Sequence, residues 1–223
     1  INDSNLELMN CYQVIKDNLD DLLTALQKHK NDEDYYYEIR ELDRKVKEYH
    51  KLSPVEKASR IIFLNKTCYN GLFRVNSQGQ FNVPFGRYKN PNILNKTVLK
   101  AVHKYLNKND VKILNEDFEI AVQDTKKGDF VYFDPPYDPV SDTASFTGYD
   151  INGFDRNEQK RLKKVYDRLT EKGVKCLLSN SATEFILDLY SNYNPILIVS
   201  ASRNINSVAK QRGKVSEVLV KNW

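Results

Sequence analysis

The sequence predicts an α/β fold built around a mostly parallel sheet. From residue 111 onward, short apolar runs alternate with amphipathic helical segments, an order typical of parallel sheets. The run Phe130–Phe133 is aromatic and β-branched and follows the turn pair Gly128-Asp129, which predicts a buried parallel strand. The last two apolar runs, 196–200 and 215–220, flank a basic loop, so we expect the sheet to end in an antiparallel hairpin.

The composition limits the class of protein. The chain has 223 residues, 40% hydrophobic and 29% charged, which suits one domain with a sizeable core and a smaller insert. Its net charge of +4 is compatible with a polyanionic partner. No apolar stretch reaches transmembrane length and no signal peptide is visible. The chain has three cysteines, Cys11, Cys68 and Cys176, without metal-ligand spacing, and three scattered histidines, His29, His50 and His103. This pattern predicts a reduced cytoplasmic compartment and no zinc site.

The N-terminal part is predicted to be helical. Apolar residues from Leu6 to Leu26 recur at helical spacing, and a second helix is expected over 35–50. Ser53, Pro54 and Glu56 predict a helix start with a capping box. A shorter helix is expected over 98–106.

Residues 68–91 differ in composition from the rest, because they contain no Asp or Glu. Gln78-Gly79 lies between two short strand-like runs and predicts a hairpin. Cations such as Arg74 and Arg87, interleaved with rings such as Tyr69 and Phe73, suit a loop that reads nucleic acid. The alternative is a solvated basic hairpin packed by its own aromatic rings; we favour nucleic-acid contact.

Two acids follow predicted strand ends near the N-terminus and in the middle of the chain. Asp3 comes after Ile1-Asn2, and Asp117 comes after a buried strand expected over 111–114, with Phe118 next to it. In dinucleotide-type folds, an acid at such a place binds ribose hydroxyls. Asp is also a favoured helix N-cap, and from position alone the cap is the better interpretation of Asp3. For Asp117 and Phe118 too, a helix N-cap followed by a core Phe is a common alternative.

The sequence Asp134-Pro135-Pro136-Tyr137 ends the central strand. Two prolines cannot donate ladder hydrogen bonds, so the strand must stop there in a stiff, extended corner. Ligands bind at the carboxyl ends of strands in open α/β sheets. The Asp134 carboxylate and the Pro135 carbonyl could accept hydrogen bonds from both N–H groups of an exocyclic amine. Tyr137 could stack on the planar ring that carries this amine. The alternative is a Pro-Pro turn with a capping Asp and a core Tyr.

Further local signals follow this corner. Residues 139–153 form a polar loop with Phe146 and Tyr149, which could close over a ligand. Asp155 with Glu158 predicts a helix start, and Gly173 its end. Residues 174–178 are expected to form a strand that ends in Ser179-Asn180, and 182–190 to form a helix.

The ordered set of blocks in this chain resembles the Dam-type (D12 class, alpha-group) site-specific DNA adenine-N6 methyltransferases over its whole length. The blocks are Ile1-Asn2-Asp3, Tyr69-Asn70-Gly71-Leu72-Phe73-Arg74, Phe81-Asn82-Val83-Pro84-Phe85-Gly86-Arg87-Tyr88, Asp117-Phe118, Asp134-Pro135-Pro136-Tyr137, Phe146-Thr147 with Tyr149, and Ser179-Asn180. The resemblance implies a Rossmann-like S-adenosylmethionine-dependent methyltransferase sheet carrying a helical and β-hairpin insert for DNA target recognition. It implies a catalytic domain over 1–30 and 105–223 and an insert over 31–104, with its hairpin at 68–91.

The resemblance also implies a role for each matched residue. Asp134, Pro135, Pro136 and Tyr137 would form the catalytic corner for a flipped-out adenine, and no metal would be needed. S-adenosylmethionine would be bound by Asp3, Asp117, Phe118 and Asp134. Double-stranded DNA, at GATC, would be contacted by Tyr69, Asn70, Leu72, Arg74, Pro84, Arg87 and Tyr88. A prokaryotic or phage-encoded cytoplasmic enzyme, as in restriction-modification, is the expected setting; the oligomeric state is left open.

One departure from the family pattern concerns the cofactor. The family has a strand and a glycine-rich loop before the Ile-Asn-Asp block, and both are missing from these 223 residues. We therefore expect weak cofactor binding by the chain as it stands, which leaves its own activity open. Two alternatives are kept: an amino-group methyltransferase acting on RNA, protein glutamine or cytosine N4, and an inactive DNA-binding remnant.

Overall fold

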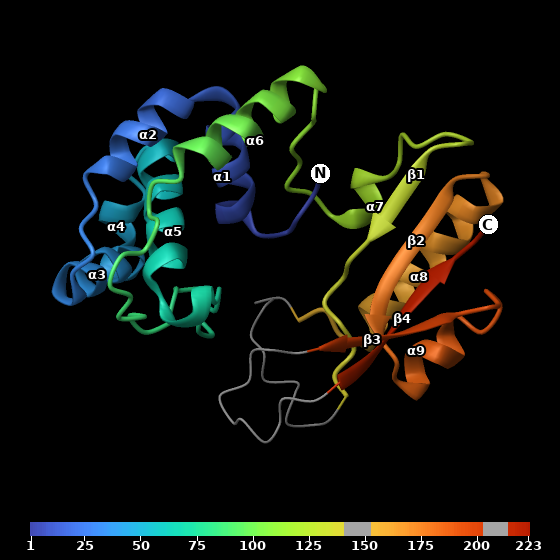
Figure 1. Ribbon diagram of the computed structural model, residues 1–223. Helices are drawn as coiled ribbons and strands as arrows, with labels where there is room; N and C mark the ends of the chain where they lie inside the picture. The colour runs from blue at the N-terminus through green and yellow to red at the C-terminus, as the bar shows by residue number, and fades with distance from the viewer. Residues whose placement is uncertain (141–152, 203–213) are drawn as a thin grey trace. The chain divides into compact units, whose positions relative to one another are not determined.

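The computed structural model describes residues 1–140, 153–202 and 214–223 (Figure 1). The chain divides into two compact units, Ile1–Asp117 and Phe118–Trp223. Most of the predicted polar loop, including Phe146 and Tyr149, and the basic loop before the last strand lie outside the described residues. The catalytic and insert boundaries predicted from the sequence stay a prediction.

The first unit is mainly helical. Its helices are α1 (Leu6–Asp17), α2 (Leu19–Gln27), α3 (Glu33–Arg40), the 3₁₀ turn η1 (Glu41–Arg44), α4 (Val46–Tyr49), α5 (Pro54–Thr67), the 3₁₀ turn η2 (Tyr69–Gly71) and α6 (Lys96–Lys108). The single helix expected from Leu6 to Leu26 is wrong, because Asn18 leaves helical geometry at φ −132° and ψ 42°. The periodicity continues across this break because α1 and α2 bury their apolar residues in the same core. The helix expected over 35–50 is likewise divided, at Lys45.

Helix α5 packs against α1, α2 and α3. Its predicted capping box is confirmed: the Glu56 N–H donates to Ser53 Oγ, and the Ser53 N–H donates to the Glu56 carboxylate at 2.8 Å. Ala58 and Ile61 enter one hydrophobic cluster with α1, α2 and α6, whereas Phe63 and Leu64 enter another. This helix therefore joins the two apolar clusters of the first unit.

Between α5 and α6 the chain turns back on itself in antiparallel pairings. Cys68 pairs with Phe85 and Val75 pairs with Phe81. Asn76 forms the turn between them, because its Oδ1 accepts the N–H groups of Gln78 and Gln80 at 2.9 and 3.0 Å. We call residues 68–86 the hairpin.

The N-terminal residues pair with the segment before Asp117. Asn2 forms a parallel bridge with Leu114, supported by a 2.9 Å bond from the Leu114 N–H to the Ile1 carbonyl. A buried strand over 111–114 was expected, and this is wrong: the segment makes a single bridge and exposes Lys112. A segment of four residues, three of them apolar, cannot by itself show whether a partner covers both of its faces.

The second unit contains a four-stranded sheet and three helices among its described residues. They are α7 (Phe118–Ala121), β1 (Phe130–Phe133), α8 (Arg156–Glu171), β2 (Lys175–Ser181), α9 (Glu184–Leu189), β3 (Leu197–Ser202) and β4 (Lys214–Lys221). The strand order is β1-β2-β4-β3; β1 and β2 are parallel, and both pairs made by β4 are antiparallel. The terminal hairpin is confirmed. The mostly parallel sheet is wrong for these strands, because β4 inserts between β2 and β3.

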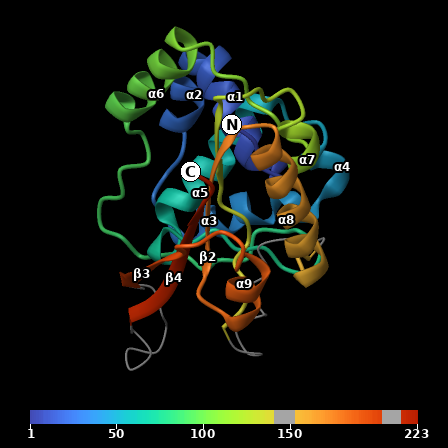
Figure 2. The same ribbon diagram turned by 90° about the vertical axis from the view of Figure 1, so that its right-hand side faces the viewer.

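Helices α8 and α9 cover one face of this sheet (Figure 2). Phe133, Leu178 and Val220 lie side by side on that face and are buried. The other face is more open at β1, where Phe130 and Tyr132 are 57% and 52% exposed. The prediction of a buried parallel strand is therefore confirmed for the parallel pairing with β2 and wrong for the burial, because β1 is an edge strand of the described sheet. Its carboxyl end leads directly into Asp134.

Candidate functional site

Asp134 follows β1 and is exposed. Its Oδ1 accepts a hydrogen bond from Ser179 Oγ at 2.8 Å, and the Tyr132 hydroxyl lies 2.9 Å from the same Ser179 oxygen. The parallel pairing of β1 with β2 explains this contact, because Phe133 is opposite Leu178 and the next residues continue the register. The carboxylate is thus oriented by a neighbouring strand while it stays accessible.

A second layer of polar side chains holds the prolines in place. Gln159 Nε2 donates to the Pro136 carbonyl at 2.7 Å, and Asn180 Nδ2 donates to Gln159 Oε1 at 3.2 Å. Asn180 Oδ1 accepts the Asp138 N–H at 2.9 Å. Gln159 and Asn180 are buried, so each bond forms where water does not compete. The corner is rigid because strand β2 and helix α8 both hold its backbone.

Gln159 and Asp138 are not predicted from the sequence. Gln159 is a polar residue on the apolar stripe of α8, three positions before Leu162, and this is the signal that could have found it. Asp138 is 2% exposed and accepts from Arg156 at 3.0 Å and from Thr183 Oγ1 at 2.7 Å. Its partners are distant in sequence, so no local pattern marks it.

Tyr137 is half-buried beside Asp134. Burial raises the pKa of its phenol, and a hydrogen bond with Ser179 partly offsets this. The side chain is therefore neutral near pH 7 and offers a flat ring with a polar tip. This arrangement suits stacking better than acid–base chemistry.

Asp3 is close to the segment that carries Asp117. The Asp3 N–H donates to the Leu114 carbonyl at 3.4 Å, and Asn115 Nδ2 donates to the Asp3 carbonyl at 2.8 Å. The interpretation of Asp3 as the helix N-cap is wrong: Asn5 caps α1 by accepting the Leu8 N–H at 3.1 Å. Asp3 Oδ1 instead accepts the Asn5 N–H at 2.7 Å. Both acids lie where two parallel segments end, which is where nucleosides bind in α/β folds.

Phe118 begins the second unit and packs against its core. The Arg161 guanidinium lies 4.0 Å from its ring centroid, and the ring of Phe154 meets it edge-on at 6.0 Å. One face of the Phe118 ring is therefore covered by a cation. Its predicted contact with a cofactor ring stays a prediction.

The predicted DNA-contacting residues all lie in the first unit, on or beside the hairpin. Tyr69 and Tyr88 are 47% and 39% exposed. Asn70 and Arg87 both have a φ of 54°, which turns the backbone sharply beside each ring. The Arg87 guanidinium pairs with Glu33 at 3.1 Å on the surface, a weak contact that a phosphate could replace.

Arg74 is held by the opposite strand of the hairpin. Its Nε donates to Asn82 Oδ1 at 2.7 Å, and its Nη2 donates to the Asn82 carbonyl at 3.0 Å. Leu72 is half-buried and Pro84 is exposed on the same hairpin. The residues predicted to read DNA thus lie on the hairpin or directly after it, while the corner predicted to be catalytic belongs to the other unit.

The described residues contain no group of three or more His, Cys, Asp or Glu side chains that could hold a metal ion. Nor do they include a helix long and apolar enough to cross a membrane. The chemical groups at the predicted sites are carboxylates, the backbone carbonyls of the Asp134–Tyr137 corner, exposed aromatic rings and arginine cations.

Comparison with known proteins gives consistent results. Residues 1–205 match the D12 class of N6 adenine-specific DNA methyltransferases. The chain is 44% identical over 225 residues to the type II methyltransferase M1.LlaDCHI of Lactococcus lactis subsp. cremoris, covering all of this chain and 78% of that protein. It is 42% identical over 234 residues to the type II methyltransferase M.MjaIII of Methanocaldococcus jannaschii, covering all of this chain and 79% of that protein. It is 32% identical over 221 residues to the DNA adenine methylase of Escherichia coli K12, covering 97% of this chain and 76% of that protein.

Proposed function

The chain belongs to the D12 class of N6 adenine-specific DNA methyltransferases, and from this we propose that it methylates N6 of an adenine flipped out of duplex DNA within GATC. The methyl donor is S-adenosylmethionine, and the setting is a restriction-modification system. The alternative acceptors weighed above, which were RNA, protein glutamine and cytosine N4, are not those of this class. The observation that carries the proposal is the exposed Asp134 carboxylate, oriented by Ser179 at the end of β1.

The corner acts on the adenine amino group. Adenine N6 is a poor nucleophile because its lone pair is delocalised into the ring. The Asp134 carboxylate and the Pro135 carbonyl each accept a hydrogen bond from one of its two N–H groups. These bonds favour a more tetrahedral nitrogen with a more available lone pair. Tyr137 stacks on the base. The hydrogen bond from Gln159 to the Pro136 carbonyl holds the backbone of the corner in place. The rate enhancement comes from positioning and electrostatics.

S-adenosylmethionine supplies a methyl group on a positively charged sulfur. Asp3 fits its ribose hydroxyls, because its carboxylate follows a paired parallel segment. Asp117 fits an adenine amino group at the end of the neighbouring segment, with the Phe118 ring beside it. Asp134 adds a negative charge that suits the sulfonium.

The hairpin reads the site. Arg74 donates to a guanine edge in the major groove, and Leu72 and Pro84 contact a thymine methyl. Tyr69 and Asn70 enter the stack that the flipped base vacates, as apolar wedge residues enter base steps in minor-groove binding proteins. Arg87 and Tyr88 hold the backbone or neighbouring bases.

The substitution Asp134→Ala tests this proposal. We expect transfer of a labelled methyl group to a GATC duplex to fall by about 10²-fold or more, because an acceptor for developing charge is lost. Duplex binding measured by fluorescence anisotropy should stay unchanged, since the hairpin is intact. Asp124→Ala is the matched control, an exposed acid of the same unit.

Three outcomes would contradict parts of the proposal. Transfer that survives in Asp134→Ala would remove the corner from the mechanism. Plasmid still cut by a GATC-specific nuclease that methylation blocks, despite active wild-type protein, would rule out GATC. Wild-type protein that binds DNA without transferring methyl groups would favour the inactive remnant.

A further inference from the structure

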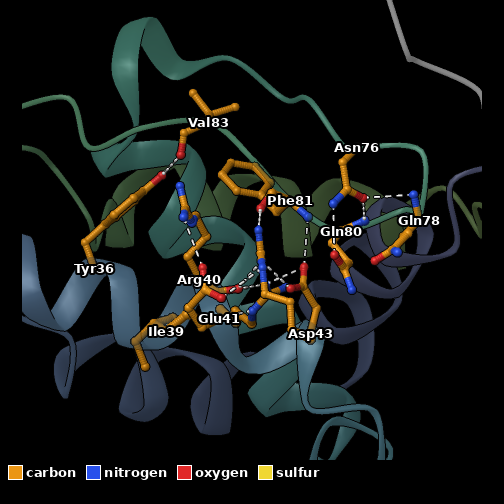
Figure 3. Close-up of polar contacts among 12 residues, drawn as sticks. Tyr36, Ile39, Arg40, Glu41, Asp43, Asn76, Gln78, Gln80, Phe81 and Val83 are labelled. Carbon is orange, nitrogen blue, oxygen red and sulfur yellow. Dashed lines mark hydrogen bonds and ion pairs between the residues drawn. The ribbon is translucent and has the colours of Figure 1, made fainter.

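A charged cluster beneath the hairpin has no part in the function described so far. It consists of Asp43 and Arg44 from η1 and Arg60 from α5. Figure 3 shows Asp43 beside Phe81 of the hairpin. Asp43 Oδ2 is 2.7 Å from Arg60 Nη2, and Asp43 Oδ1 is 2.6 Å from Arg44 Nη1. The side chains of Arg60 and Asp43 are only 3% and 12% exposed, so this ion pair is largely shielded from water.

The cluster binds the backbone of one hairpin strand. Asp43 Oδ2 accepts the Phe81 N–H at 2.8 Å, and Arg44 Nη2 donates to the Phe81 carbonyl at 2.9 Å. The Tyr36 hydroxyl, on α3, donates to the Val83 carbonyl at 2.8 Å. In a strand, alternate residues direct their backbone groups to opposite edges. The backbone groups of Phe81 and Val83 on the outer edge of the hairpin are therefore hydrogen bonded by side chains of α3 and η1. A third strand would otherwise pair with this edge.

The residue between them has the opposite orientation. The Asn82 N–H donates to the Arg74 carbonyl at 3.0 Å, and the Asn82 carbonyl and side chain hold the Arg74 guanidinium. Two of the five guanidinium N–H donors are used in this contact, which fixes the plane of the group. The placement of Arg74 thus depends on the placement of Asn82. Asn82 lies between Phe81, which the cluster holds, and Val83, which Tyr36 holds.

The cluster is itself anchored to two helices. Arg60 Nε and Nη2 donate to the Ile39 and Arg40 carbonyls at the end of α3, at 2.9 and 2.8 Å. The Arg60 guanidinium also lies 5.1 Å from the ring centroid of Tyr49. A carboxylate that bonds two guanidinium groups and a backbone N–H has little freedom to move. Asp43 therefore transmits the position of α3 and α5 to the hairpin.

We propose that Asp43 is a positioning residue for base recognition, because it sets the Phe81–Asn82–Val83 strand and through it the direction of the Arg74 guanidinium. This inference rests on the proposed function, in which Arg74 reads a guanine edge. Recognition of a base edge depends on donors placed within a fraction of an ångström, so a shift of the strand should weaken discrimination more than binding.

The test compares two substrates, so that a loss of folded protein cancels. The kcat/KM for methylation of a GATC duplex is divided by that for the same duplex with 7-deazaguanine, which removes the N7 acceptor. In Asp43→Asn we expect this ratio to fall by about fivefold or more, towards the ratio of Arg74→Ala, since one good bidentate contact gives discrimination of this order. The double variant should show the ratio of Arg74→Ala alone, because both changes remove the same contact.

Glu41→Gln is the matched control. Glu41 pairs with Arg40 and with Arg44 of the cluster, yet among the described residues it makes no bond to the hairpin. The substrate ratio of Glu41→Gln should therefore equal that of the wild type. If Asp43→Asn does not fold, Tyr36→Phe replaces it: this change keeps the buried ring, removes only the bond to Val83, and should lower the ratio by a smaller factor.

Equal losses on both substrates in Asp43→Asn, with an unchanged ratio, would overturn the proposal and leave Asp43 a purely structural residue. Failure of the proposed function has a different signature, namely no transfer by the wild-type protein. In that case the ratio of dissociation constants for the two duplexes, measured with the same variants, decides the positioning role.

Discussion

Ser179 links two groups at the predicted catalytic corner. Its hydroxyl donates to Asp134 and lies 2.9 Å from the Tyr132 hydroxyl. At this scale the sequence indicates the exposed groups well, because Asp134 and Tyr137 share one short motif. It does not reveal Gln159 or Asp138, whose partners come from other elements. The chemistry is local in sequence, whereas the supports that orient it are not.

Replacing Ser179 with alanine should slow methyl transfer while leaving duplex binding unchanged. The Asp134 carboxylate loses a donor worth about 0.5–1.5 kcal/mol, so kcat should fall by roughly 2- to 10-fold. Steady-state kinetics and anisotropy titrations measure the two effects. Ser191→Ala, at an exposed turn after α9, serves as the control and should match the wild type. An unchanged kcat in Ser179→Ala would mean that Asp134 needs no orientation from β2.

Helix α5 illustrates what the sequence predicts at the scale of an element. Ser53, Pro54 and Glu56 mark its start correctly, because a capping box is made by residues close in the chain. The breaks at Asn18 and Lys45 were not predicted, since the apolar period continues across both. Start signals are chemical and local; a break inside a periodic segment depends on how the two halves pack.

The capping box provides a stability prediction for this element. Ser53→Ala removes the acceptor for the Glu56 N–H, and should lower the free energy of unfolding by about 1 kcal/mol. Urea denaturation followed by circular dichroism measures the change. Thr97→Ala, at an exposed position in the first turn of α6, is the comparison and should cost little or nothing. Equal stability of Ser53→Ala and the wild type would show that α5 is fixed by its packing alone.

At the scale of the whole molecule, the sequence predicts the α/β class but not the sheet. The run Phe130–Phe133 and the terminal hairpin are visible locally, and both are present. The insertion of β4 between β2 and β3 is a choice of partners far apart in the chain, which periodicity cannot encode. The same limit applies to the cluster around Asp43, where residues 36–60 meet residues 81–83. Family resemblance supplied the roles of the hairpin, whereas contacts beneath it required the structure.

The three buried cysteines make the organisation into units measurable. Cys11 and Cys68 lie in the two apolar clusters of the first unit, and Cys176 lies in the cluster of the second. Burial raises the pKa of Cys11 to about 12 and those of Cys68 and Cys176 to about 11, so little reactive thiolate forms in the folded protein. Reaction with a thiol reagent therefore reports opening of each cluster.

We expect Cys11 and Cys68 to become reactive at the same urea concentration. Helix α5 contributes Ala58 and Ile61 to one cluster and Phe63 and Leu64 to the other, so neither can open while this helix keeps its place. Cys176 reports the second unit independently and sets its own midpoint. Pulsed alkylation across a urea series, read by mass spectrometry of peptides, gives all three midpoints, with the fully denatured chain as the reference for intrinsic reactivity. Reaction of Cys68 at a much lower urea concentration than Cys11 would contradict this expectation. The apolar cluster around Cys68 would then open while the apolar cluster around Cys11 stays folded.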